Sequence, residues 1–237
     1  MKTVVICLHG LIKDAPHDFI PFKQYVEENN IDIEVNCLML YDIANKKTYK
    51  YKNKLKLLDE TISNYEKEGY RIILVGYSFS TGLVARMCKN HSIYKAILIS
   101  PVMHIITRSG INYYLSLFFK SFKMRAKAMM NKKKRNRLKK MNSLYLFDLL
   151  CSCFYALHKT NRSFKYIKCP TLVMFGKKDE ITYPKYLSQI RNQIGSKVDF
   201  KINFYPEANH VFIMSKKVDK SIYYKDMIEF AMDGEKI

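Results

Sequence analysis

Short apolar runs alternate along the chain with longer segments whose apolar residues recur every three or four positions. The runs are typical of buried strands, and the longer segments are typical of amphipathic helices. The runs that predict strands cover residues 3–8, 33–40, 71–77, 94–100, 171–175 and 201–205. The segments that predict helices cover residues 19–29, 55–68, 81–89, 184–194 and 215–232. This alternation predicts an α/β fold with a mostly parallel central sheet and helices on both faces.

A different pattern begins after Pro101. From there to about Tyr166, strand-like runs give way to long helical stretches that carry many basic residues. Beyond this region the alternation resumes, and the chain has no internal repeat and no Gly- or Ser-rich linker. The 237 residues therefore predict one domain, with residues 1–102 and 167–237 as its core and residues 103–166 as an insertion.

Ser78 stands at the centre of Gly76-Tyr77-Ser78-Phe79-Ser80, between the apolar run of residues 71–75 and the helix predicted for residues 81–89. A buried strand, a tight turn of small residues and a helix, with serine at the apex, is the arrangement of a nucleophile elbow. Such a turn is strained and brings strand and helix close together, so it favours small residues. The alternative is a serine in an ordinary turn. A nucleophile at Ser78 requires an acid and then a histidine later in the chain.

An acid and a histidine follow in that order. Asp179 comes after the apolar run of residues 171–175 and a glycine-containing turn, and His210 comes after the strand predicted for residues 201–205. A serine hydroxyl needs a base that takes its proton, and the imidazole needs a carboxylate that fixes its tautomer. His210 is the only histidine after Asp179. Glu180 competes for the acid position, and Asp179 is also suited to cap a helix or turn.

His9-Gly10-Leu11 follows the first apolar run. With these residues, the elbow at Ser78 and the order Ser, Asp, His, the chain resembles the α/β-hydrolases, in particular the small carboxylesterases and monoacylglycerol-lipase-like serine hydrolases. The resemblance extends over essentially the whole chain. The sequence departs from the family at Ser80, where the family usually has glycine. It also lacks a glycine-rich loop after Gly10 and a Gly-His-Gly after the third strand.

The resemblance implies an α/β-hydrolase fold in which residues 103–166 form a helical cap. It also implies a catalytic triad that consists of Ser78, Asp179 and His210. The backbone N–H groups of Leu11 and Phe79 are expected to form the oxyanion hole, and His9 is expected to shape the loop that carries Leu11. Neither a metal ion nor an organic cofactor is needed for this chemistry.

The expected function is that of an enzyme, a serine hydrolase that cleaves carboxylic esters through an acyl-enzyme on Ser78. Its partner is then a small acyl ester, with apolar residues of the insertion lining an acyl pocket. A thioesterase or an amide hydrolase stays open, because the acyl-enzyme is common to all three. A non-catalytic binding protein that uses the basic insertion on a hydrolase scaffold also stays open, and the missing glycine at Ser80 favours it.

The net charge of +20 is concentrated in the insertion. Residues 104–168 contain 16 Lys and Arg and one acid, Asp148, which gives +15 and leaves +5 for the rest of the chain. One interpretation is a solvated helical face. A second is peripheral contact with an anionic membrane, which the aromatic and aliphatic neighbours of these basic residues would support. Nucleic-acid binding is not expected, because no known nucleic-acid motif accompanies the charge.

The six cysteines lie mainly in apolar contexts that are typical of inert core residues, and their spacing does not match a zinc site. A reducing cytoplasm is the expected location. The N-terminal apolar run is too short for the apolar region of a secretion signal. No stretch reaches about 18 uninterrupted apolar residues, so no membrane-spanning helix is predicted.

Overall fold

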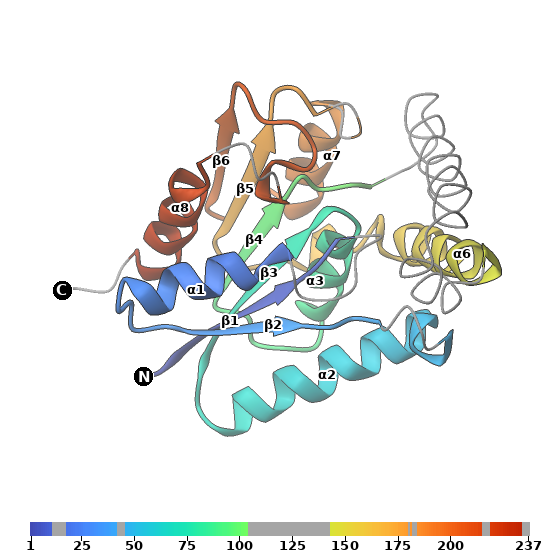
Figure 1. The fold of residues 1–237 in the computed structure, drawn as a ribbon, viewed down its shortest axis with the longest axis horizontal. Coiled ribbons are helices and arrows are strands. Elements are labelled where there is room, and N and C mark those ends of the chain that lie inside the picture. The colour runs from blue at the N-terminus through green and yellow to red at the C-terminus, as the bar shows by residue number, and fades with distance from the viewer. Residues whose placement is uncertain are drawn as a thin grey trace, which may run out of the picture.

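The structure is a computed structural model of the 237-residue chain. It describes residues 1–10, 18–41, 46–103, 143–179, 181, 184–214 and 219–233. Within these residues, α-helices and β-strands alternate along most of the chain (Figure 1). The predicted α/β fold is therefore confirmed.

The centre of the fold is a six-stranded sheet in the order β2-β1-β3-β4-β5-β6, and every neighbouring pair of strands is parallel (Figure 1). The strands are β1 (Thr3–Leu8), β2 (Glu34–Leu38), β3 (Arg71–Tyr77), β4 (Lys95–Ile99), β5 (Thr171–Gly176) and β6 (Phe200–Tyr205). Because the strands are parallel, their carboxyl ends meet at one edge of the sheet. The turns after β3, β5 and β6 therefore meet there, and these turns carry the three residues predicted to be catalytic.

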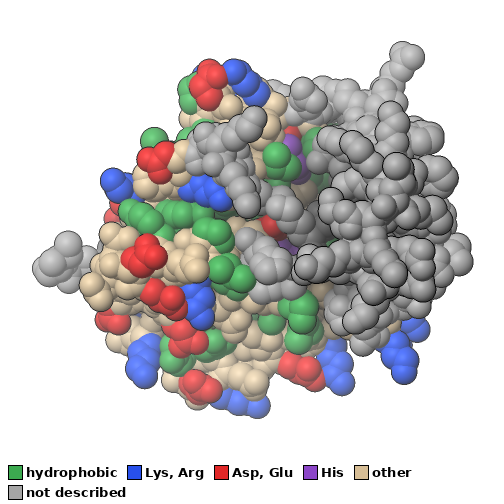
Figure 2. Space-filling model, in the orientation of Figure 1, with side chains coloured by type: hydrophobic (Ala, Val, Ile, Leu, Met, Phe, Trp, Pro, Cys, Tyr) green, Lys and Arg blue, Asp and Glu red, His purple; other side chains and the backbone are tan. Residues whose placement is uncertain are grey.

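The helices are α1 (Ile20–Glu28), α2 (Tyr51–Lys67), α3 (Thr81–Met87), α6 (Ser143–Thr160), α7 (Pro184–Ile194) and α8 (Ser221–Met232). Short 3-10 helices are η2 (Lys46–Tyr49), η3 (Ser78–Ser80), η4 (Phe164–Tyr166) and η5 (Phe212–Met214). On the part of the face in Figure 2 that the described residues form, acidic and basic side chains are interspersed. This mixture agrees with the small net charge outside residues 104–168.

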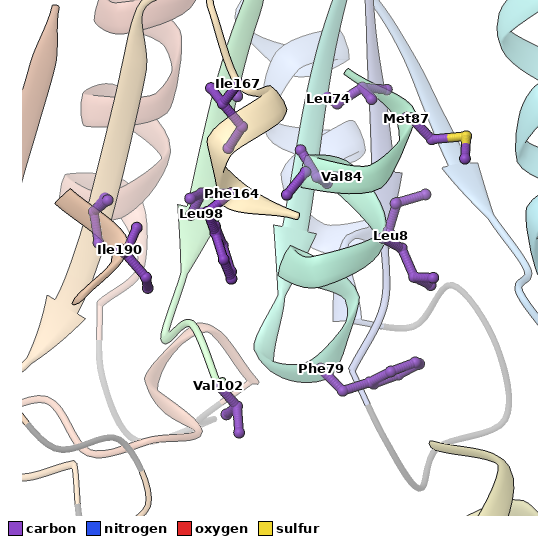
Figure 3. Packing of buried hydrophobic residues seen from close by; sticks show 14 of the residues in the cluster. Leu8, Leu74, Phe79, Val84, Met87, Leu98, Val102, Phe164, Ile167 and Ile190 are labelled. Carbon is purple, nitrogen blue, oxygen red and sulfur yellow. The ribbon is translucent and has the colours of Figure 1, made fainter. Parts of the chain in front are cut away.

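Two hydrophobic cores lie on opposite faces of the sheet, because successive side chains of a strand point to opposite sides. Ile6 and Leu8 of β1 pack into one core, together with buried residues of α2, α3, α6 and α7 (Figure 3). Val5 and Cys7 pack into the other core, with buried residues of α1 and α8. Helices thus cover both faces, as the sequence pattern predicts.

Two helices begin elsewhere than predicted: α8 begins at Ser221 rather than at residue 215, and α2 begins at Tyr51 rather than at residue 55. Lys54 occupies a core position of α2 one turn before Leu58 and is fully buried. Because this core position holds a lysine and not an apolar residue, the apolar pattern does not indicate the first turn of α2. The Lys54 ammonium group donates hydrogen bonds to the carbonyl of Tyr49 and to Ser152 Oγ, the latter at 3.1 Å. These bonds satisfy a charge that would otherwise be costly to bury. Sequence periodicity could not predict them, because Ser152 is 98 positions away.

The α6 helix belongs to the segment predicted as an insertion, and its last turns pack on the core. Cys153, Ala156, Leu157 and Thr160 are buried, and α6 contacts α3. Residues 104–142 lie outside the described residues, so the boundaries of a cap stay a prediction. No helix among the described residues is long and apolar enough to cross a membrane.

Candidate active site

Ser78 lies immediately after β3 at the apex of a tight turn into α3. Its φ angle is 58°, in the left-handed region that residues other than glycine rarely adopt. The turn is compact enough that a Cβ atom on Gly76 would lie 2.9 Å from the backbone of Thr81. Thr81 Oγ1 donates a hydrogen bond of 2.7 Å to the Ser78 carbonyl, which closes the turn. The strand, strained serine and helix have the geometry of a nucleophile elbow.

Ser80 replaces the family's glycine in this turn, and its hydroxyl is fully used. Ser80 Oγ accepts a hydrogen bond of 2.8 Å from the Tyr77 N–H, and its one proton lies within reach of two carbonyl oxygens, that of Leu8 at 2.8 Å and that of Tyr77 at 2.9 Å. The side chain is completely buried. The serine in place of glycine therefore connects the elbow to the end of β1, and the turn remains compact. Sequence alone could not show this, because Leu8 lies 72 positions from Ser80.

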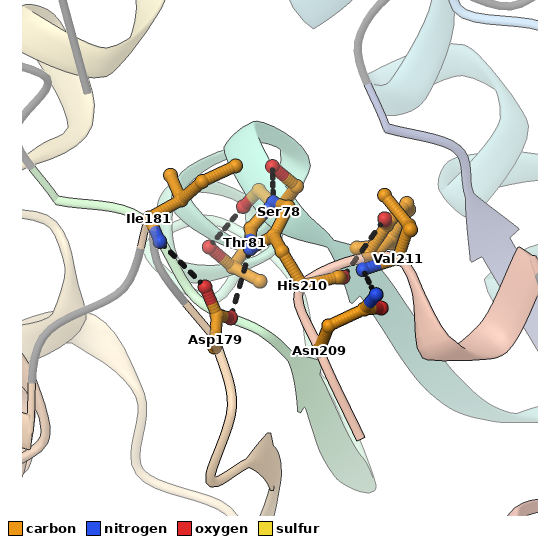
Figure 4. Close-up of polar contacts among 8 residues, drawn as sticks. Ser78, Thr81, Asp179, Ile181, Asn209, His210 and Val211 are labelled. Carbon is orange, nitrogen blue, oxygen red and sulfur yellow. Dashed lines mark hydrogen bonds and ion pairs between the residues drawn. The ribbon is translucent and has the colours of Figure 1, made fainter. Parts of the chain in front are cut away.

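The structure brings Ser78, His210 and Asp179 into one chain of contacts at the carboxyl edge of the sheet (Figure 4). Ser78 Oγ lies 3.0 Å from His210 Nε2, and His210 Nδ1 lies 2.8 Å from Asp179 Oδ2. All three come from turns that follow strands, namely β3, β5 and β6. The two distances are in the range of good hydrogen bonds.

The partners of Asp179 fix the tautomer of the histidine. The Asp179 side chain is fully enclosed, and its Oδ1 accepts a hydrogen bond of 2.8 Å from the Ile181 N–H. Its Oδ2 is left to accept the proton on His210 Nδ1. A neutral imidazole that carries its proton on Nδ1 has a free electron pair on Nε2. His210 Nε2 is therefore the acceptor for the Ser78 hydroxyl proton.

The described residues include only one of the two that are predicted to form the oxyanion hole. Phe79 follows Ser78 in η3, and its side chain is anchored in the core that also contains Leu8 and Leu83, so its backbone is held beside the serine. Leu11 lies outside the described residues, as does Glu180, the competing acid. The contribution of the Leu11 and Phe79 amides to an oxyanion hole stays a prediction.

His9 lies next to this region and is fully buried. Its Nε2 accepts a hydrogen bond of 3.0 Å from the Leu40 N–H, and its Nδ1 donates to the Gly10 carbonyl at 2.8 Å. Burial lowers the pKa of His9 to about 4, so the ring is neutral at neutral pH. Two further side chains that sequence reasoning missed hold the same glycine: Asp18 accepts from the Gly10 N–H, and the Tyr41 hydroxyl donates to its carbonyl.

Within the part of the chain that the structure describes, no group of three His, Cys, Asp or Glu side chains is placed to hold a metal ion.

Comparisons with known proteins place this geometry in a family. A family model described as serine aminopeptidase, S33, matches residues 48–217, which include Ser78, Asp179 and His210. No curated protein matches the sequence.

Solved structures share the fold at low sequence identity. An esterase from Exiguobacterium antarcticum has a TM-score of 0.66 at 14% identity, over 98% of this chain and 92% of that chain. The hydrolase olei00960 from Oleispira antarctica has a TM-score of 0.65 at 13% identity, over 97% and 92%. A putative non-heme bromoperoxidase, BpoC, from Mycobacterium tuberculosis H37Rv has a TM-score of 0.66 at 12% identity, over 100% and 94%.

The family model covers more than half of the chain, and the similar structures extend over almost all of it. The predicted resemblance is thus confirmed at the level of the fold and the superfamily. The chain has an α/β-hydrolase fold and belongs to the serine aminopeptidase S33 family of hydrolases.

Proposed function

We propose that this hydrolase is a serine esterase that cleaves carboxylic esters through an acyl-enzyme on Ser78. The single observation that carries the proposal is the chain of contacts from Ser78 Oγ to His210 Nε2 and from His210 Nδ1 to Asp179. Three residues that are distant in the sequence meet in the order that proton transfer requires. The strained φ angle of Ser78 adds support, because strain of this kind concentrates at functional sites.

The proposed reaction proceeds in two halves. His210 Nε2 takes the hydroxyl proton as Ser78 Oγ attacks the ester carbonyl, and Asp179 stabilises the imidazolium that forms. Collapse of the tetrahedral intermediate breaks the bond to the leaving alcohol, which receives the proton from His210. A water molecule then attacks the acyl-enzyme, again with His210 as the base. The released carboxylic acid leaves Ser78 in its starting form.

The names of some similar proteins support an ester as the substrate. The Exiguobacterium antarcticum protein is an esterase, and another similar structure comes from a study of two metagenome-derived lipolytic enzymes, with a TM-score of 0.66 at 11% identity. A second candidate is amide hydrolysis, because the matching family model is described as a serine aminopeptidase. A thioester is open on chemical grounds, since all three substrates share one acyl-enzyme.

Hydrolysis of p-nitrophenyl esters by the purified protein tests the proposal, with Ser78→Ala as the decisive variant. We expect Ser78→Ala to lower kcat/KM by at least about 10³-fold, because the nucleophile is lost. Ser92→Ala, in an exposed loop before β4, is the matched control and should keep full activity. Activity that survives Ser78→Ala would remove Ser78 from the mechanism.

A fluorophosphonate probe separates an enzyme from a binding protein on the same scaffold. The probe forms a covalent bond only with an activated serine, so we expect labelling of the wild-type protein and of Ser92→Ala but not of Ser78→Ala. An unlabelled wild-type protein would favour the binding protein. Acyl-CoA and aminoacyl amide substrates, measured beside the esters, then rank thioester and amide hydrolysis against ester hydrolysis.

A further inference from the structure

Tyr77, the residue before the proposed nucleophile, joins two parts of the site that are far apart in the sequence. Its hydroxyl donates a hydrogen bond of 3.0 Å to the backbone carbonyl of His210. Its backbone N–H donates to Ser80 Oγ within the elbow, at 2.8 Å. The Tyr77 side chain is only 3% exposed, so water competes little for the bond to His210. One rigid side chain thus connects the backbone beside Ser78 with the backbone of His210.

The ring of Tyr77 fills the space between the histidine and the end of β1. Its centroid lies 5.9 Å from the centroid of the His210 ring, with an interplanar angle of 33°. On its other side it packs against Gly10, where an added Cβ atom would lie 2.6 Å from Tyr77 Cδ1. Tyr77 therefore holds the elbow, the histidine turn and the end of β1 at fixed distances from one another.

The histidine turn is also fixed from the side of the acid. His210 Nδ1 bonds to Asp179, and the Lys178 N–H donates to the Ala208 carbonyl at 2.9 Å. Both contacts tie the turn to the residues that follow β5. On the side of the elbow, the contact between Ser78 Oγ and His210 Nε2 cannot last through the reaction, because Ser78 Oγ becomes acylated. The hydrogen bond from Tyr77 to the His210 carbonyl involves no reacting atom, so it persists.

We propose that Tyr77 is a positioning residue that keeps His210 aligned with Ser78 through the whole cycle, including the acyl-enzyme stage. The inference rests on the proposed function and adds a residue that acts through His210. It assigns Tyr77 a specific role in deacylation, when His210 must activate water without the help of its bond to Ser78.

Tyr77→Phe tests this role, because it removes the hydroxyl and keeps the ring. We expect kcat for p-nitrophenyl esters to fall by roughly 10- to 100-fold, in line with the cost of small displacements of catalytic groups, while kcat/KM, which reports acylation, falls less, so that KM falls as well. Deacylation should slow more than acylation, so a burst of p-nitrophenol near one equivalent should appear or grow. Replacement of Tyr77 by p-aminophenylalanine retains a donor at the same place and should restore most of kcat.

Tyr205→Phe is the matched control. Tyr205 is also a buried tyrosine, and its hydroxyl donates to the Asp226 carboxylate on α8. We expect Tyr205→Phe to lower the Tm without lowering kcat. If the wild type is active and labelled by fluorophosphonate, and Tyr77→Phe lowers only the Tm, the positioning role is wrong and the proposed function stands. A wild type that is neither active nor labelled would overturn the proposed function and this inference with it.

Discussion

At the scale of single residues, the elbow shows how a side chain can take over the role of a missing glycine. Ser80 is small enough for the close approach of β3 and α3, and its hydroxyl has partners on both sides. The sequence shows that the family's residue is replaced. It does not show that the replacement adds a bond between the elbow and β1.

Ser80→Ala should destabilise the protein, because it leaves the Leu8 carbonyl and the Tyr77 N–H buried without this partner. Loss of a partner for a buried polar group costs about 1–3 kcal/mol. Urea unfolding of the variant should therefore give a lower free energy of unfolding, and Ser80→Gly should lose a similar amount although it restores the family's residue. The exposed Ser92→Ala serves as the reference. An unchanged unfolding midpoint for both Ser80 variants would contradict the structural role.

His9 should make the stability depend on pH between about 4 and 6.5. Burial lowers the pKa of His9 from 6.5 to about 4, so in this range the unfolded chain binds a proton that the folded chain does not. The neutral His9 contributes about 3 kcal/mol to the free energy of unfolding. This contribution is complete above pH 6.5 and is lost as the pH falls towards 4.

His9→Gln provides the comparison, because the Gln carbonyl can accept the Leu40 N–H without titrating. Urea unfolding of both proteins between pH 7 and pH 4 should show a smaller loss of stability in the variant. Parallel pH curves for the two proteins would show that His9 does not carry this dependence.

At the scale of elements, α6, which lies in the predicted insertion, packs tightly on α3, the helix that follows Ser78. Gly82 of α3 faces Thr160 of α6, and an added Cβ atom on Gly82 would lie 2.2 Å from Thr160 Oγ1 and 2.8 Å from Thr160 Cβ. The absence of a side chain at Gly82 therefore allows α6 to approach α3 closely.

Gly82→Ala should therefore move the end of α6 away from α3 and destabilise the protein by roughly 1–3 kcal/mol, the usual cost of overpacking. Thr160→Ala removes Oγ1, the nearer of the two clashing atoms, and keeps Cβ, so the double variant should recover part of this loss. Unfolding free energies of the four proteins form a double-mutant cycle. Additive effects of the two substitutions would contradict the contact.

At the scale of the whole molecule, the charge distribution separates the core from the insertion. Residues 104–168 carry +15 of the net charge of +20, and acidic and basic side chains of the described residues are mixed on the face shown in Figure 2. Basic residues near an anionic membrane each contribute about 1 kcal/mol to binding, and salt screens this attraction. We propose that the insertion brings the protein to anionic lipid surfaces.

Sedimentation with liposomes tests this proposal. The protein should bind phosphatidylserine liposomes at low salt, dissociate from them at about 0.5 M salt and not bind neutral phosphatidylcholine liposomes. Replacement of Lys132, Lys133, Lys134 and Arg135 by Gln should weaken binding strongly. The matched control replaces four exposed core lysines by Gln, at Lys52, Lys67, Lys197 and Lys201, and should have a smaller effect. Binding that is absent or insensitive to salt would count against the proposal.

The sequence by itself determined the type and order of most elements and the three residues that meet at the carboxyl edge of the sheet. Hydrophobic periodicity reports which side of a local element is buried, and a parallel sheet necessarily gathers the turns after its strands. Hydrophobic periodicity is local information, so it predicts the wrong start for α2, where a buried Lys54 stands in place of an apolar residue.

Only the tertiary structure decided how those turns are held together. The bonds from Ser80 to Leu8 and from Tyr77 to His210 join residues 72 and 133 positions apart. A hydroxyl group has many potential partners in a sequence, and only the packed fold determines which polar atom lies within its reach. That Ser78, Asp179 and His210 lie at one edge of the sheet could thus be predicted from the chain, whereas the contacts that align them depend on the folded arrangement of β1, β3, β5 and β6.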